Sequence, residues 1–173
     1  MKWPVRRWLT GWTLAAVLAG CIQLPKRPAA PFGGIAHFGY VTPEIYRGGQ
    51  PTPAGFDYLK KLGVRTVVKL DTDAQGNDAY AESIGMTVTR IPITTWQQVF
   101  GPVPVNQIDQ AARELPAGSY IHCQHGQDRT GLFVYRYRRL HGWSKADAER
   151  ELLSNGFHRV LHGLWECVEK DRN

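Results

Sequence analysis

A short segment from His122 to Gly131, with the sequence HCQHGQDRTG, holds the residues whose types and spacing predict chemistry. Cys123 is followed, after five intervening residues, by Arg129 and then Thr130. An ionised cysteine is a strong nucleophile, and the planar guanidinium of an arginine donates two parallel hydrogen bonds to two phosphoryl oxygens. The spacing therefore predicts a site at which Cys123 attacks a phosphorus atom that Arg129 holds.

The elements on either side of this segment are expected to position it. Tyr120 and Ile121 form the end of a predicted strand, and the apolar run 132–135 continues a predicted helix. A tight loop between a strand and a helix N-terminus turns its main-chain N–H groups toward one point, where they bind an anion. We expect these groups to bind phosphate and to keep Cys123 as the thiolate. The residues that donate them are Gln124, His125, Gly126, Gln127, Asp128 and Arg129.

The pattern HC-x5-R-T resembles the signature of the cysteine-dependent protein tyrosine phosphatases, in particular the small dual-specificity type. Segments 45–51 and 55–68 are similar to the first strand–helix–strand unit of atypical bacterial and fungal members. Segment 142–157 is similar to the helical tail of bacterial periplasmic members. Rhodanese-type sulfurtransferases also carry a cysteine loop, but theirs is usually shorter. The resemblance covers roughly residues 38–165 and implies a dual-specificity phosphatase-like fold there.

Hydrophobic patterning predicts strands that alternate with helices. Predicted strands cover 38–41, 45–47, 65–70, 86–91 and 119–123. Predicted helices cover 53–62, 78–84, 105–115, 130–141 and 144–155, with a last helix beginning near Val160 and an irregular stretch at 92–104. This alternation predicts an α/β fold, with a mostly parallel central sheet flanked by helices. Such sheets bind ligands at the carboxyl ends of their central strands.

The resemblance also implies the reaction, which is hydrolysis of a phosphomonoester without a cofactor or a metal. Cys123 is expected to form a phosphocysteine intermediate that water then hydrolyses. The hydroxyl of Thr130 is expected to bond the sulfur and make it a better leaving group, and His122 to support the loop. Gly126 is expected to take a backbone conformation closed to other residues. A protein tyrosine or dual-specificity phosphatase is the main interpretation. An inositol phosphate or phosphoinositide phosphatase and a phosphate-binding pseudophosphatase remain open.

The proton donor of the resembled family has no counterpart in this sequence. Dual-specificity phosphatases carry an aspartate on a loop upstream of the cysteine, and the corresponding stretch 92–104 has no carboxylate. Asp128, inside the phosphate loop, is one candidate donor. Asp71 and Asp73, which follow a predicted strand, are the second. The third possibility is no side-chain donor, in which case only good leaving groups depart well.

Several side chains are candidates for the rim of the site. Trp96 and His125 are placed to flank an aromatic phosphoester, although either could equally fill core or surface. Arg47, Arg65 and Arg90 lie near predicted strand ends. For these arginines solvated surface charge is the default expectation, and contact with a polyphosphorylated substrate is the alternative.

The N-terminus predicts export and a lipid anchor. Basic residues precede a short apolar run that ends in Leu-Ala-Gly-Cys at 18–21. This order is typical of a secretory signal, and the run is shorter than the ~20 residues that a membrane span requires. Leu-Ala-Gly-Cys resembles a bacterial lipobox, which implies cleavage before Cys21 and lipid on its sulfur. Because Ile22 rather than an aspartate follows, we expect a periplasmic protein held at the outer membrane.

This processing divides the chain into three parts. Residues 1–20 are the expected lipoprotein signal peptide, 21–36 the lipidated cysteine with a flexible linker, and 37–173 the phosphatase catalytic domain. The full chain has 21 basic and 15 acidic residues, a net charge of +6, and without residues 1–20 it has 18 and 15, or +3. So mild a charge does not favour a nucleic-acid partner. The expected partners are a phosphorylated protein or small phosphoester, and the bacterial membrane.

Cysteine content leaves one question open in an oxidising compartment. If Cys21 carries lipid, the remaining thiols are Cys123 and Cys167. A disulfide between them would block the nucleophile. A buried structural thiol is the expected state of Cys167, with a redox partner of Cys123 as the alternative.

Overall fold

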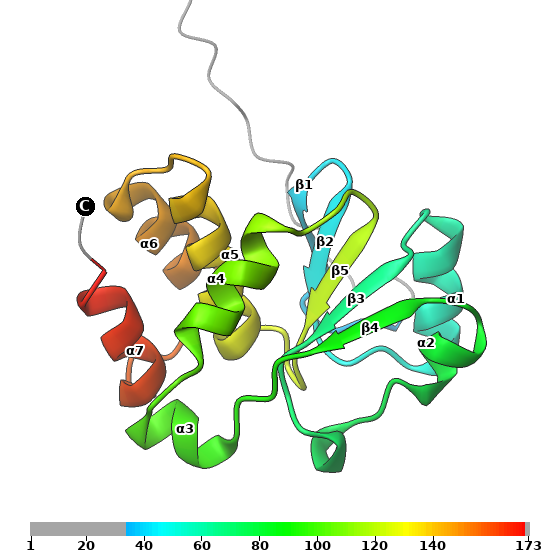
Figure 1. The fold of residues 1–173 in the computed structure, drawn as a ribbon, viewed down its shortest axis with the longest axis horizontal. Helices are drawn as coiled ribbons and strands as arrows, with labels where there is room; N and C mark the ends of the chain where they lie inside the picture. The colour runs from blue at the N-terminus through cyan, green and yellow to red at the C-terminus, as the bar shows by residue number, and fades with distance from the viewer. Residues whose placement is uncertain (1–33, 172–173) are drawn as a thin grey trace, which may run out of the picture.

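The computed structural model describes residues 34–171, and its centre is a five-stranded sheet (Figure 1). The order across the sheet is β1-β2-β5-β3-β4. The strands are β1 (Gly39–Thr42), β2 (Ile45–Gly48), β3 (Thr66–Lys69), β4 (Thr87–Arg90) and β5 (Ser119–His122). All neighbouring pairs are parallel except β1 with β2, so the predicted mostly parallel sheet is confirmed. The expected signal peptide and Cys21 lie outside the described residues.

Helices cover both faces of this sheet (Figure 1). On one side lie α1 (Pro53–Lys61) and α2 (Ala79–Ser83). The other side carries α3 (Thr95–Phe100), α4 (Val105–Arg113), α5 (Asp128–Leu140), α6 (Lys145–Ser154) and α7 (His162–Glu169). A single 3-10 turn, η1 (Asp73–Gln75), follows β3. Within residues 34–171, no helix is both long and apolar enough to span a bilayer.

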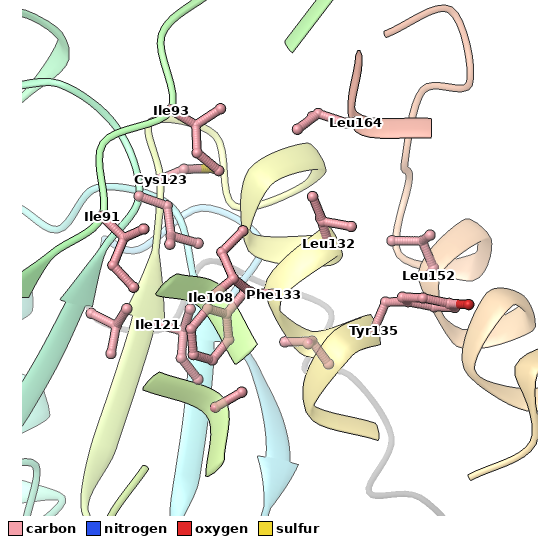
Figure 2. Packing of buried hydrophobic residues seen from close by; sticks show 14 of the residues in the cluster. Ile91, Ile93, Ile108, Ile121, Cys123, Leu132, Phe133, Tyr135, Leu152 and Leu164 are labelled. Atoms are coloured by element: carbon pink, nitrogen blue, oxygen red, sulfur yellow. The ribbon is translucent and has the colours of Figure 1, made fainter. Parts of the chain in front are cut away.

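Alternation along the strands divides the core into two apolar clusters. Val67 and Tyr120 face α1 and α2, whereas their neighbours Val68 and Ile121 face the larger group of helices. Figure 2 shows this larger cluster, with Phe133 of α5 among isoleucines of the sheet and its loops. Fully burying one such side chain contributes about 1.5–3 kcal/mol. The clusters on both faces hold β5 firmly, and β5 leads directly into the cysteine loop.

The stretch 92–104, expected to be irregular, contains α3 instead. Thr94 begins this helix, because its Oγ1 accepts the N–H of Gln97 at 3.2 Å while Gln97 Oε1 accepts the N–H of Thr94 at 2.9 Å. This reciprocal pair is a capping box. A helix of six residues is too short to show a periodic apolar pattern, so only the cap signals it.

The register of the parallel strands brings three strand ends together. Gly48 of β2 and Lys69 of β3 both align with His122 of β5. The loops that follow these strands therefore leave the sheet at the same edge, and they surround the residue that comes next in the chain, Cys123.

Candidate active site

Cys123 lies at the end of β5, with its side chain buried. Its Sγ accepts the N–H of Gly126 at 3.3 Å and the hydroxyl of Thr130 at 3.2 Å. The bond predicted between Thr130 and the sulfur is therefore confirmed. Both hydrogen-bond donors are thus directed at the sulfur atom itself.

The loop can wrap this tightly because Gly126 has a positive φ of 78°. A Cβ at this position would collide with the backbone of Gly48 and Gly49. The expected special conformation of Gly126 is thus confirmed, and the close approach of β2 explains why only glycine fits.

Arg129 is nearly fully buried, and one terminal nitrogen of its guanidinium, Nη1, is bonded to the protein. Its Nη1 donates to Gln75 Oε1 at 2.7 Å and to the carbonyl of Ile93 at 3.0 Å. Its Nε is buried and has no hydrogen-bond partner in the described structure. A buried N–H without a partner is costly, so the edge carrying Nε is the one left for an anion.

Arg47 departs from its expected role as solvated surface charge. It is only 3% exposed, and its Nη2 donates to the carbonyl of Gly126 at 2.9 Å. The default expectation was wrong because β2 is an interior strand whose end lies beneath the loop. Arg65 and Arg90 are exposed as expected, and Arg90 pairs with Glu82 at 2.8 Å.

A buried polar network lies beneath the cysteine loop. His122 Nε2 lies 2.8 Å from Asp78 Oδ2, and Gln50 donates to Asp78 Oδ1 at 2.7 Å. Burial alone would raise the pKa of Asp78, but the hydrogen bonds from His122 and Gln50 and the charge of Lys69 hold the pKa below its ordinary value. The supporting role expected of His122 agrees with this geometry.

Sequence reasoning missed the buried polar network around His122, and in particular Lys69. Lys69 is fully buried, and its Nζ bonds Asp71 at 2.8 Å, the carbonyl of Gly76 at 2.8 Å and Gln50 at 3.3 Å. The available signal was a lysine at the end of the apolar strand Thr66–Lys69, where a buried charge needs partners.

The three candidate proton donors differ in position. Asp71 is buried, and its Oδ1 accepts from Lys69 Nζ at 2.8 Å. Asp73 is exposed at the start of η1. Asp128 begins α5, and its Oδ1 accepts the N–H of His158 at 2.8 Å and lies 3.0 Å from the ring Nδ1.

The other loop side chains face away from the sulfur. Gln124 accepts from Gln75 at 3.2 Å, and Gln127 donates to the carbonyl of Gly156 at 3.2 Å. The side chain of His125 is exposed, while its carbonyl contacts His37 Nδ1 at 2.7 Å. That their main-chain N–H groups bind phosphate stays a prediction.

Two further candidates lie on helices α3 and α7. The side chain of Trp96 is 67% exposed on α3, and its ring centroid is 4.2 Å from that of Phe100. Cys167 lies half-buried in α7, where burial raises the pKa of its thiol and its Sγ donates to the carbonyl of Gly163 at 3.3 Å. Both Cys123 and Cys167 are free thiols, so the structure contains no disulfide between them.

Residues 35–159 match the sequence model of the tyrosine phosphatase family. The chain belongs to this family. The dual-specificity protein phosphatase TpbA of Pseudomonas aeruginosa is 32% identical over 120 residues, which cover 68% of this chain and 53% of TpbA. Inositol diphosphatase DSP4 of Arabidopsis thaliana is 29% identical over 113 residues, covering 62% of this chain and 57% of DSP4. The chain thus spans about half the length of the curated relatives it matches.

Solved structures of the same family have the same fold. A crystal structure of P. aeruginosa TpbA covers 86% of this chain and 92% of its own, with a TM-score of 0.68 and 25% identity. A cysteine-to-serine variant of TpbA in complex with pTyr covers 84% of this chain and 90% of its own, with a TM-score of 0.67 and 25% identity. The predicted dual-specificity phosphatase-like fold is confirmed.

Proposed function

We propose that the protein is a cysteine-dependent phosphomonoester hydrolase, and specifically a tyrosine or dual-specificity phosphatase. One observation carries the proposal: the buried, unpartnered Nε of Arg129 belongs to the same short loop as the sulfur of Cys123. A thiolate alone is a poor anion site, and an arginine edge alone performs no chemistry. Together they bind a phosphoryl group and attack it.

The reaction proceeds in two steps. The Cys123 thiolate attacks phosphorus, the bond between phosphorus and the ester oxygen breaks, and the leaving oxygen takes up a proton. Main-chain N–H groups of the loop and the free edge of Arg129 stabilise charge on the phosphoryl oxygens. Water then attacks phosphorus, the sulfur leaves with the Thr130 hydroxyl bonded to it, and phosphate is released.

Asp128 is the proposed donor of the proton to the leaving oxygen, because it belongs to the loop itself. Its Oδ1 accepts the main-chain N–H of His158 at 2.8 Å, and this bond holds the carboxylate at the start of α5, beside the loop.

Hydrolysis of p-nitrophenyl phosphate tests the proposal. Wild-type protein should turn over this substrate, and Cys123→Ser should lower kcat by at least about 10³-fold while still binding phosphate. Arg129→Lys should also be severely impaired, because an ammonium cannot reproduce the two-pronged geometry. Vanadate should inhibit by occupying the loop, whereas EDTA should have no effect. A serine variant that retained wild-type turnover would exclude the covalent mechanism.

An inositol phosphate substrate is the second candidate function, favoured by the relatives named inositol diphosphatases. Comparing kcat/KM for a phosphotyrosine peptide, a phosphoserine peptide and inositol phosphates separates the two. The main proposal expects the phosphotyrosine peptide to give the highest value. Phosphate binding without turnover of any substrate would instead identify a pseudophosphatase.

We also propose that the protein is exported and held by lipid on Cys21 at the periplasmic face of the outer membrane. The support is the Leu-Ala-Gly-Cys run at 18–21 behind a short apolar segment. Cys21→Ser should abolish incorporation of radiolabelled palmitate and release the protein from the membrane fraction, with kcat/KM unchanged. Equal labelling of both proteins would exclude the anchor.

A further inference from the structure

Gln75, on the single-turn η1, contacts the catalytic arginine from outside the cysteine loop. Its Oε1 accepts from Arg129 Nη1 at 2.7 Å, and its Nε2 donates to Gln124 Oε1 at 3.2 Å. The loop after β3 and the loop after β5 leave the sheet at the same end (Figure 1). One side chain therefore joins both ends of the phosphate loop, Gln124 just after the nucleophile and Arg129 at its far end.

The N–H donors of Arg129 fall into two groups, those bonded to the protein and those left for a ligand. Nη1 is occupied by Gln75 and the carbonyl of Ile93, whereas Nε is buried without a partner. A guanidinium is rigid and planar, so fixing one corner fixes the direction of the opposite edge. The two acceptors on Nη1 therefore turn the edge with Nε and Nη2 toward the position of a phosphoryl group.

The turn that carries Gln75 is itself held by the buried network. Lys69 Nζ donates to the carbonyl of Gly76, the next residue along the chain, at 2.8 Å. Lys69 also contacts Gln50, which donates to Asp78, the partner of His122. Gly76 packs so closely on Gln50 that a Cβ there would collide with its side chain. The strand that ends in the nucleophile and the turn that holds the arginine are thus parts of one rigid assembly.

The neutrality of Gln75 matters for an anion site. An amide oxygen orients Arg129 as a hydrogen-bond acceptor but leaves the positive charge of the arginine available to phosphate. A carboxylate at the same position would form an ion pair with Arg129 and compete with the phosphoryl oxygens for it.

We propose that Gln75 is a positioning residue that sets the orientation of Arg129 toward the phosphoryl group. This inference rests on the proposed phosphatase function. Gln75 does not take part in bond making, and it acts through the guanidinium. Its loss should weaken both phosphate binding and transition-state stabilisation.

The test uses Gln75→Leu, which keeps the length of the side chain and removes both hydrogen bonds. We expect kcat/KM for p-nitrophenyl phosphate to fall by about 10- to 100-fold, the value of one charge-assisted hydrogen bond. Gln110→Leu, on the exposed face of α4, is the matched control and should stay within about twofold of wild type. In the Arg129→Lys background, Gln75→Leu should have no additional effect, since the oriented guanidinium is already gone.

Binding of inorganic phosphate separates this inference from the proposed function. Calorimetric titration of Cys123→Ser should give tighter binding than Cys123→Ser with Gln75→Leu, and Gln75→Glu should weaken binding at least as much. If the wild type hydrolyses the ester but Gln75→Leu changes neither kcat/KM nor phosphate affinity, the positioning role is excluded and the phosphatase function stands. An equal effect of Gln75→Leu with and without Arg129 would also exclude it.

Discussion

Asp78 Oδ2 lies 2.8 Å from His122 Nε2, both side chains are completely buried, and His122 immediately precedes the nucleophile in the sequence. This pair connects α2, on one side of the sheet, to the strand that ends at Cys123. The cysteine loop is therefore supported by buried, hydrogen-bonded polar side chains, whereas the strands around it are held by apolar packing.

Replacing Asp78 should change both the free energy of unfolding and its dependence on pH. The pKa of Asp78 is lowered in the folded protein, so its contribution to stability is present above the unfolded value of about 3.9 and is lost as pH falls below it. Asp78→Asn should lower the free energy of unfolding at neutral pH by about 2–3 kcal/mol and flatten its decrease in acid. Urea unfolding across a pH series measures both effects. Asp57→Asn, at an exposed position of α1, is the control and should change neither.

Gly126→Ala should disrupt the phosphate loop. The positive φ costs a side chain about 1–2 kcal/mol, and the collision with Gly48 and Gly49 adds to it, so we expect activity to fall by more than about 10²-fold. Gly63→Ala is the matched control, because Gly63 has a φ of 87° and open space around its Cβ position. It should carry the conformational cost alone and keep full activity. Similar turnover in the two variants would contradict the close approach.

Thr130→Ala should slow the second chemical step more than the first. The hydroxyl lies 3.2 Å from Cys123 Sγ and stabilises the thiolate as it leaves phosphorus. The variant should release one equivalent of p-nitrophenol in a burst, followed by turnover that is about 10- to 100-fold slower than wild type. Thr130→Ser should restore the single-phase time course. A variant without a burst would place the role of this hydroxyl elsewhere.

Asp128→Asn should affect poor leaving groups most, if Asp128 supplies the proton. An aryl phosphate with an acidic phenol departs without help, whereas an alkyl phosphate needs almost a full proton. The variant should show a steeper dependence of rate on leaving-group pKa and lose the basic limb of its pH profile, with a loss of about 10²–10⁴-fold for the poorest leaving groups. Equal slowing of all substrates would mean that Asp128 only shapes the loop. The same series on Asp71→Asn and Asp73→Asn then tests the remaining carboxylates.

Much of the fold follows from local signals in the sequence. Thr52 caps α1 by accepting the N–H of Gly55, and Pro53 occupies its first turn, as the sequence predicts. The cysteine loop can be recognised equally well, because its glycine, arginine and threonine lie within five residues, 126–130. Residues that contact one another within a single turn or loop lie close together in the sequence, so their pattern can be recognised there.

The parts that escaped prediction depend on contacts across the sequence. Arg47 reaches Gly126 from 79 residues away, and Gln75 reaches Arg129 from 54 residues away. Neither contact leaves a motif in the sequence, because each depends on the register of β2, β3 and β5 rather than on neighbouring residues in the chain. The short helix α3 was missed for another reason, since tertiary packing against α7 stabilises a segment with almost no periodicity.

Gly163 lies in the first turn of α7 and packs so closely on α3 that a Cβ would collide with the carbonyl of Gln97. Helix α3 follows directly from Ile93, whose carbonyl holds Arg129. Helix α7 thus supports, through α3, one of the two contacts that hold Nη1 of Arg129. A side chain at position 163 would therefore act at a distance, because it would displace α3 and with it the carbonyl of Ile93 that helps to orient the guanidinium.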